Sequence, residues 1–252
     1  MRIIDLSATI AQTPADTPEY SAVGITYRNH REGAAAIENM LSVPVALLRN
    51  GEGWATETIT RLETHGTTHV DAPWHFNSTI GGHKAPTIEE LPLEWFFSDG
   101  VKLDFHIRED GDPITAEDVE KELRRIKYVL KPMDIVLMYT GRDVFYGQSD
   151  YFFHGCGVTA EATRWLYEKG IRVMGIDAWG WDMPLNLQAG KAIAENKPGV
   201  FWAAHQLDAA YSHMERLVNL GDLPPCGFQV ACFPLKIKGA SGAPARVVAI
   251  LS

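Results

Sequence analysis

The stretch Thr64-His-Gly-Thr-Thr-His-Val-Asp-Ala-Pro-Trp-His-Phe76 holds the densest group of metal-binding side chains in the sequence. His65, His69, Asp71 and His75 fall within eleven positions, although the chain has only nine histidines in all. Neutral imidazole nitrogen and carboxylate oxygen are donors that zinc, manganese and similar divalent cations accept. The stretch therefore predicts a metal site. The alternative interpretation is a polar loop that binds no ion.

The spacing of these residues limits the backbone that could bring them together. A continuous helix turns the second pair of ligands away from the first, and Pro73 would interrupt it. In an extended chain all four side chains face one way, but His65 and Asp71 of a straight strand would lie roughly 20 Å apart. The chain must therefore turn between His65 and His69, and Gly66 is free to make that turn.

Composition limits the classes of protein that fit. The 252 residues are 46% hydrophobic and 22% charged, which is typical of a globular protein with a substantial core. The formal charge of −9 argues against a nucleic-acid partner, because phosphate binding needs a basic face. The sequence has no run of 18 apolar residues and no signal-peptide pattern at its start, so we expect no membrane segment.

The three cysteines are an odd number without Cys-x-x-Cys spacing. Cys156, Cys226 and Cys232 therefore favour reduced, structural thiols and a cytoplasmic location over a disulfide framework or a cysteine metal site.

Hydrophobic periodicity predicts strands on both sides of the histidine stretch and helices after it. The predicted strands are 2–9, 25–29, 41–48, 54–63, 101–105, 134–139, 172–176, 200–204, 227–238 and 245–251, and the predicted helices are 87–96, 115–126 and 159–169. Strands come first, then strands alternating with helices, then strands again. This order predicts a single α/β domain over residues 1–252, built on a mixed β-sheet.

Further polar residues in the C-terminal third could complete the site. His205 follows the predicted strand 200–204, and His213 and Glu215 would face the same side of an extended segment. Each of the three also has a structural interpretation, as a strand-end histidine or a surface carboxylate. Asp177 and Asp182 are predicted to cap turns rather than bind an ion.

Several motifs together make the chain resemble a known family, the metal-dependent cyclase-like hydrolases, which include bacterial kynurenine formamidase and isatin hydrolase. The family signature places His, His, Asp and His at offsets 0, 4, 6 and 10 with Pro at 8, as His65, His69, Asp71, His75 and Pro73 do here. The resemblance extends to residues 4–7 and 232–246, and one difference is a glycine that comes one position early.

The resemblance implies a role for each residue of the site. His65, His69 and Asp71 would hold a first divalent metal, zinc or manganese, and His75 would be the general acid/base. In two-metal members Asp71 would bridge to a second ion held by His205 and Glu215, with His213 as the alternative to His205. The resemblance also implies a swivelling β/β/α fold and a homodimer or larger homo-oligomer.

The leading functional hypothesis is metal-dependent hydrolysis of an amide or lactam C–N bond in a small aromatic substrate. Trp74, Trp179, Trp181 and Phe76 are candidate walls for such a pocket, although aromatic side chains are more often core. Two alternatives stay open. One is a lyase, cyclase or dehydratase acting through an enolate, and the other is a metal-binding protein without catalysis.

Overall fold

The computed structural model describes residues 1–15, 17 and 19–251 of the chain. Its internal contacts divide the chain into two compact units, Met1–Thr9 with Thr67–Ser252, and Ile10–Gly66. The larger unit contains a nine-stranded sheet, and the described residues of the smaller unit contain a two-stranded antiparallel sheet and an α-helix. The predicted α/β class on a mixed sheet is confirmed, whereas the domain boundaries 1–252 stay a prediction.

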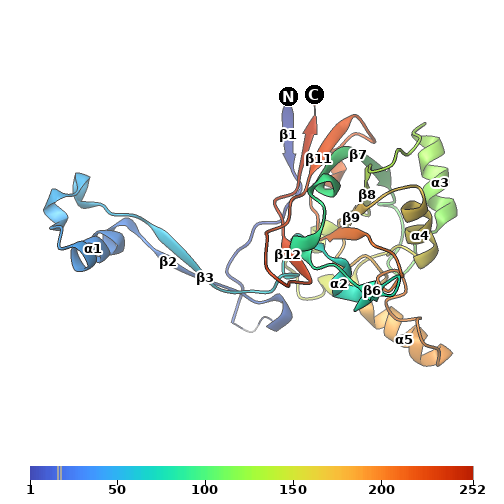
Figure 1. Ribbon diagram of the computed structural model, residues 1–252, viewed down its shortest axis with the longest axis horizontal. Helices are drawn as coiled ribbons and strands as arrows, with labels where there is room; N and C mark the ends of the chain where they lie inside the picture. Colours follow the sequence, from blue (N-terminus) through green and yellow to red (C-terminus); the bar gives the residue numbers. More distant parts are fainter. Residues whose placement is uncertain (16, 18, 252) are drawn as a thin grey trace. The chain divides into compact units, whose positions relative to one another are not determined.

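The sheet of the larger unit is parallel in its centre and antiparallel at both ends. In spatial order its strands are β1 (Arg2–Asp5), β13 (Val248–Leu251), β11 (Phe228–Ala231), β7 (Phe97–Asp104), β8 (Ile135–Tyr139), β9 (Val173–Ile176), β10 (Ser212–Glu215), β4 (His69–Asp71) and β12 (Gly242–Pro244). Pairing is parallel from β7 to β10 and antiparallel elsewhere. The first and last strands pair, so both ends of the chain lie side by side (Figure 1).

The central strands are buried on both faces, because each face supports its own hydrophobic core. On β8, Val136 and Met138 enter one core and Ile135 and Leu137 enter the other, as alternation along a strand requires. Helices α3 (Ala116–Arg125) and α4 (Ala160–Glu168) cover the first core and lie beside each other in Figure 1. Burial on both faces explains why these strands are continuous apolar runs in the sequence.

The remaining elements of the larger unit are short. They are the helices α2 (Pro73–Phe76) and α5 (Leu185–Glu195), the hairpin of β5 (Thr79–Ile80) and β6 (His83–Lys84), and 3₁₀ turns at Ile88–Glu90, Leu93–Phe96, Arg142–Phe145, Tyr151–Phe153 and Leu220–Asp222. Within the described residues, no helix has both the length and the apolar character needed to cross a membrane.

The smaller unit pairs β2 (Val23–Arg28) with β3 (Thr56–Leu62) and places α1 (His30–Leu41) between them in sequence. It also contains 3₁₀ turns at Glu19–Ser21, Val45–Leu47 and Arg49–Gly51. Asn29 and Glu32 form a reciprocal capping box at the start of α1. A Cβ on Gly33 would lie 1.8 Å from the carbonyl oxygen of Trp54, so only glycine allows α1 to approach this segment so closely.

Two predicted strands are wrong. Residues 41–48 instead contain the end of α1, a left-handed cap at Ser42 and a 3₁₀ turn, because the helix begins at the Asn29 cap and the chain then turns at Pro44. Residues 200–204 form turns, with Trp202 at a φ of +58°. Helices α1 and α5 were not predicted, and the segment 87–96 forms 3₁₀ turns rather than one helix.

Candidate metal centre

The candidate metal centre lies where β4 pairs with β10. The two strands are antiparallel, and Glu215 lies opposite His69. Because side chains alternate along a strand, His69 and Asp71 share one face with His213 and Glu215, and the residues between them pack into the second core. The register of this strand pair therefore places these four potential metal ligands, two from each strand, on a common face of the sheet.

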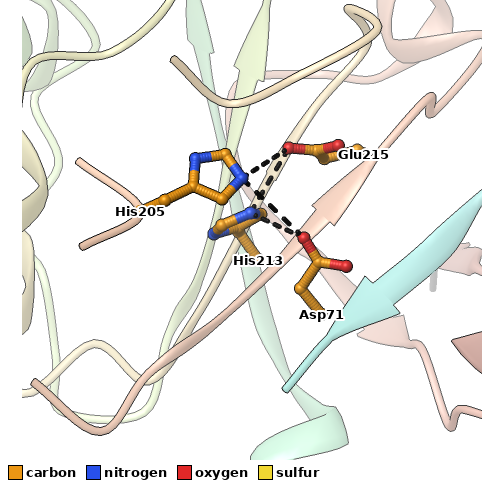
Figure 2. Close-up of side chains that lie close together, drawn as sticks. All are labelled: Asp71, His205, His213 and Glu215. Atoms are coloured by element: carbon orange, nitrogen blue, oxygen red, sulfur yellow. Dashed lines mark ion pairs between the residues drawn. The ribbon is translucent and has the colours of Figure 1, made fainter. Parts of the chain in front are cut away.

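Four buried side chains approach one another closely, and each offers one donor atom. These donors, from Asp71, His205, His213 and Glu215, all lie within 4.8 Å of one another. His213 Nε2 is 3.0 Å from Asp71 Oδ2 and 3.3 Å from Glu215 Oε1. His205 Nε2 is 3.4 Å from the same Glu215 oxygen and 4.0 Å from Asp71 Oδ2. Figure 2 shows the two rings directed at the two carboxylates.

The chemistry and spacing of this cluster fit a divalent ion. Four donors at about 2 Å around a tetrahedral ion would lie about 3.3 Å from one another. The four nitrogen–oxygen separations between these histidines and carboxylates, 3.0 to 4.0 Å, bracket that value. Two imidazole nitrogens with two carboxylate oxygens form the borderline donor set that zinc or manganese accepts. Two carboxylates buried so close together also need positive charge beside them.

His69 approaches the oxygens of Asp71 and Glu215 that do not face His213. Its Nε2 lies 3.1 Å from Asp71 Oδ1 and 3.7 Å from Glu215 Oε2, and its Nδ1 lies 2.7 Å from the carbonyl oxygen of Thr67. The Thr67 contact fixes the ring so that Nε2 faces the carboxylates. Asp71 thus directs one oxygen toward His69 and the other toward His213, which is the orientation that a bridging carboxylate needs.

His75 lies at the edge of the centre, on α2. Its ring centroid is 6.1 Å from that of His205 and 5.4 Å from that of Trp202, and the side chain is half-buried. Pro73 is the first residue of this helix and therefore starts a helix instead of only interrupting one. His75 is not one of the four donors of the cluster, but a nitrogen of its ring and an oxygen of Asp71 also lie within 4.8 Å of each other.

His65 belongs to the smaller unit, one residue before its end. Its Nδ1 lies 3.0 Å from the hydroxyl of Thr64. A hydrogen-bonded turn comes just before the predicted place, since the Gly66 N–H donates to the Glu63 carbonyl oxygen over 2.9 Å. Between His65 and His69 the chain bends at residues 66–68. However, Gly66 does not adopt left-handed backbone, so its freedom at positive φ is not what makes the turn.

A second layer of contacts fixes the two C-terminal histidines. Asp182 Oδ2 accepts from His205 Nδ1 over 2.5 Å and from the His205 backbone N–H over 3.1 Å. The ring of His213 is stacked between Phe76 and Trp181, at centroid distances of 5.7 and 5.6 Å. These contacts leave the Nε2 atom of each imidazole facing the carboxylates.

We expect Asp182→Asn to lower metal affinity about 10- to 100-fold, because the partner that orients a metal-binding imidazole contributes on that scale. A competition titration against a chromogenic chelator measures the affinity. Asp208→Asn is the matched control, since the Asp208 carboxylate is exposed and accepts from the Gly81 N–H, away from His205. Equal affinities for Asp182→Asn and the unaltered protein would contradict the assigned contact.

Without an ion, protons provide the positive charge in the cluster. Burial lowers the pKa of His205, but hydrogen bonds to Asp182 and Glu215 outweigh it and raise the pKa to about 10. Burial and the neighbouring His205 lower the pKa of His213, but its bonds to Asp71 and Glu215 raise it overall. Burial raises the pKa of Glu215, and the two imidazoles nevertheless hold it well below its usual range.

These shifts predict that metal binding releases protons. The pKa of His205 is raised to about 10, so at pH 8 its imidazole is protonated and must lose that proton before Nε2 can bind an ion. The affinity for the metal should therefore rise as the pH is raised towards about 10, and it should weaken as the pH is lowered. Calorimetric titration with Zn²⁺ in two buffers of different ionisation enthalpy should show release of about one to two protons per ion. Equal binding enthalpies in the two buffers would contradict this prediction.

The remaining candidate residues, Asp177 and the three tryptophans, are not among the donors of the cluster. Asp177 accepts from the backbone and hydroxyl of Thr140 and from the Gly141 N–H, and burial raises its pKa to about 7. Trp181 is core, and Trp74 and Trp179 are partly exposed. The Asp182–His205 contact was missed, because nothing in the sequence joins residues 23 positions apart.

The three cysteines have free thiols, as expected. Cys156 and Cys232 are buried, and burial raises the pKa of the Cys156 thiol to about 12. A thiol this difficult to ionise suits packing rather than catalysis.

Comparison with known proteins identifies the class to which this fold and cluster belong. The family described as "Putative cyclase" matches residues 4–183, and the chain belongs to this family. Its curated relative Cyclase-like protein 1 from Oryza sativa subsp. japonica is 25% identical over 197 residues. That match covers 75% of this chain but only 63% of the rice protein, less than two thirds of its length.

Solved structures share the fold over almost the whole chain. Isatin hydrolase A from Labrenzia aggregata, bound to benzyl benzoate, is 26% identical with a TM-score of 0.73, covering 99% of this chain and 93% of its own. Isatin hydrolase A from Ralstonia solanacearum is 23% identical with a TM-score of 0.75, covering 100% and 92%. A potential metal-dependent hydrolase with cyclase activity is 22% identical with a TM-score of 0.63, covering 98% and 96%. The family resemblance seen in the sequence is confirmed.

Proposed function

We propose that this protein is a metal-dependent hydrolase that cleaves an amide or lactam C–N bond of a small aromatic substrate. The observation that carries the proposal is the buried cluster of two imidazoles and two carboxylates at the junction of β4 and β10. Membership of the cyclase family and the 26% identity to an isatin hydrolase support it.

The proposed ligands form two groups that share Asp71. His65, His69 and Asp71 are assigned to a first zinc or manganese ion because they match the signature of the family. His205 and Glu215 are assigned to a second ion, and the position of His213 in the cluster supports adding it to that group. Asp71 would be shared by the two groups, which is supported by the contact of its Oδ1 with His69 and of its Oδ2 with His213.

A bound divalent ion would supply a Lewis acid and lower the pKa of water, which makes hydrolysis practicable at neutral pH. The side chains of the protein provide charge, orientation and proton transfer. Asp71 and Glu215 hold negative charge at the centre, and Asp182 keeps the His205 ring oriented. His75, beside the cluster, takes a proton from the attacking water and gives one to the leaving nitrogen. Its half-buried side chain, with the ring centroid 6.1 Å from that of His205, would remain accessible to a substrate.

The experiment that tests this function combines metal analysis with a substrate screen. The purified protein is analysed for zinc and manganese, and the metal-loaded form is assayed against N-formyl anilines, lactams and lactones. We expect one or two ions per chain and hydrolysis with incorporation of oxygen from ¹⁸O-labelled water. Turnover without labelled oxygen in the product would instead favour the lyase or cyclase alternative. Full metal loading with no turnover of any compound would favour a binding protein.

We also propose a cytoplasmic homodimer or larger homo-oligomer. The unit Ile10–Gly66 exposes large apolar side chains, with Tyr27 at 61%, Leu47 at 76% and Ile59 at 53% exposed. A two-stranded sheet of this kind is marginally stable alone, and such side chains are typical of an interface. Sedimentation velocity should give at least twice the mass of 27.9 kDa. A monomer at all concentrations would contradict the proposal.

A further inference from the structure

Arg216 is a buried cation directly beside the candidate metal centre. The residue follows Glu215 at the end of β10 and is 5% exposed. Its φ of +57° lies in the left-handed region, so its side chain leaves the alternation of the strand. Its backbone is fixed on both sides, since the N–H donates to the Ala178 carbonyl and its own carbonyl accepts from the Thr68 hydroxyl.

The guanidinium lies over an aromatic ring and has few polar partners. Its carbon is 4.8 Å from the ring centroid of Trp179. Among the described residues, its one hydrogen-bond acceptor is the Trp179 carbonyl, 3.5 Å from Nε, which is at the limit of a hydrogen bond. Within the same part of the chain, the Glu215 and Asp71 carboxylates act on it through their charge and not through a hydrogen bond. Arginine is seldom this buried without a paired anion.

The groups whose charges act on this guanidinium connect it to the metal centre. They are the carboxylates of Glu215 and Asp71, and the neutral phenols of Tyr151 and Tyr146 are also within electrostatic range of the guanidinium. The Tyr146 hydroxyl is in turn 3.3 Å from the hydroxyl of Thr67, at the start of the histidine stretch. A divalent ion in the cluster would neutralise the two carboxylates that offset Arg216 at longer range. The metal-loaded protein therefore has a buried cation that needs an anion.

We propose that Arg216 forms a carboxylate-binding subsite beside the metal centre, so that the ligands of this protein carry a carboxylate or gain one on hydrolysis. A guanidinium has five N–H donors in a planar fork that fits a carboxylate, and stacking on Trp179 holds that plane in place. The inference rests on the proposed function, because hydrolysis of an amide C–N bond leaves a carboxylate at this centre. Arg216 would then both select acidic ligands and hold the product.

The test is calorimetric titration of benzoate and of the neutral analogue benzyl alcohol into zinc-loaded and metal-free protein. Arg216→Met removes the charge at similar volume, and Arg216→Lys retains the charge without the planar fork. We expect Arg216→Met to weaken benzoate binding on the order of 10- to 100-fold, the range for a lost charge-assisted pair. The benzoate affinity of Arg216→Lys should lie between those of the unaltered protein and Arg216→Met. Benzyl alcohol should bind equally to all three proteins.

Arg172→Met is the matched control, because Arg172 also lies over an aromatic ring, 4.3 Å from the centroid of Tyr167, but bonds only to backbone carbonyls. It should bind benzoate normally. Zinc content and melting temperature verify that each variant is folded, and Arg216→Lys supplies the comparison if Arg216→Met is unstable. Unchanged benzoate affinity in the Arg216 variants, or no benzoate binding by the unaltered protein at 10 mM, would overturn the inference.

The two proposals can fail separately. Hydrolysis of N-formyl anilines by the unaltered protein, with benzoate binding independent of Arg216, would leave the hydrolase standing without the subsite. Benzoate binding that depends on Arg216, in a protein that hydrolyses nothing, would leave the subsite standing without the hydrolase.

Discussion

Replacing His75 with alanine is expected to lower kcat about 10²- to 10⁴-fold while the metal stays bound, because general acid/base catalysis contributes on that scale. His75 is close to the cluster, with its ring 6.1 Å from that of His205, yet it is not among the four clustered donors. Its loss should therefore remove proton transfer and leave ion binding unchanged. Steady-state kinetics on a substrate from the screen, together with metal analysis of the same preparation, measure both quantities.

The control for this substitution is His83→Ala, which removes an exposed histidine on β6. It should leave both kcat and metal content unchanged. Added imidazole should restore part of the activity of His75→Ala and none of that lost in a metal-ligand variant. Full turnover by His75→Ala with metal bound would remove His75 from the mechanism. A loss of metal would make it a ligand instead.

Replacing Asp71 with asparagine is expected to abolish metal binding and, with it, the stabilisation that metal provides. Asp71 Oδ1 is 3.1 Å from His69 Nε2, and its Oδ2 is 3.0 Å from His213 Nε2. Asparagine keeps the shape of the side chain but loses the charge and replaces one oxygen with an amide donor, which cannot bind an ion. The donor shared by both proposed groups of ligands would be lost.

Thermal and chemical unfolding with and without Zn²⁺ measure this effect. Zinc at 1,000 times its dissociation constant stabilises a folded protein by about 4 kcal/mol, and Asp71→Asn should show none of this. Asp177→Asn is the matched control, because Asp177 is also a fully buried carboxylate but bonds to Thr140 and Gly141 outside the cluster. It should change the baseline stability and retain the response to zinc. An undiminished response in Asp71→Asn would remove Asp71 from the centre.

The fold class could be predicted because its strongest signals are local. The apolar run at 134–139 and the capped helices at 115–126 and 159–169 correspond to β8, α3 and α4. Helix α5 could not be found in this way, since only Gln188 of its eleven residues is buried and the helix has little apolar periodicity. Helix α1 could have been found from the Asn29-x-x-Glu32 capping box. The division at Gly66 depends on contacts that no local pattern reveals.

The candidate site, like the fold, could be predicted from the residues where the signal is local and not where it depends on tertiary contacts. Strand alternation correctly indicated that His213 and Glu215 share a face, because that rule needs only two positions of separation. The approach of β10 to β4 is a tertiary pairing across more than 140 positions and came only from the family resemblance. The Asp182–His205 contact and the burial of Arg216 depend on turns after strands, where side-chain direction follows no period.

The four clustered donors differ in the backbone that holds them. Asp71, His213 and Glu215 are on strands within the sheet, and β4 is paired on both sides. His205 alone is on a turn, which is anchored by Asp182 and by the bond from the Trp202 N–H to Gln188. Moving a strand donor requires several ladder bonds to break, whereas the turn can open by losing a few contacts. An ion would therefore enter and leave beside His205, and its residence time would be set by the opening rate of this one turn, independently of the global stability of the sheet.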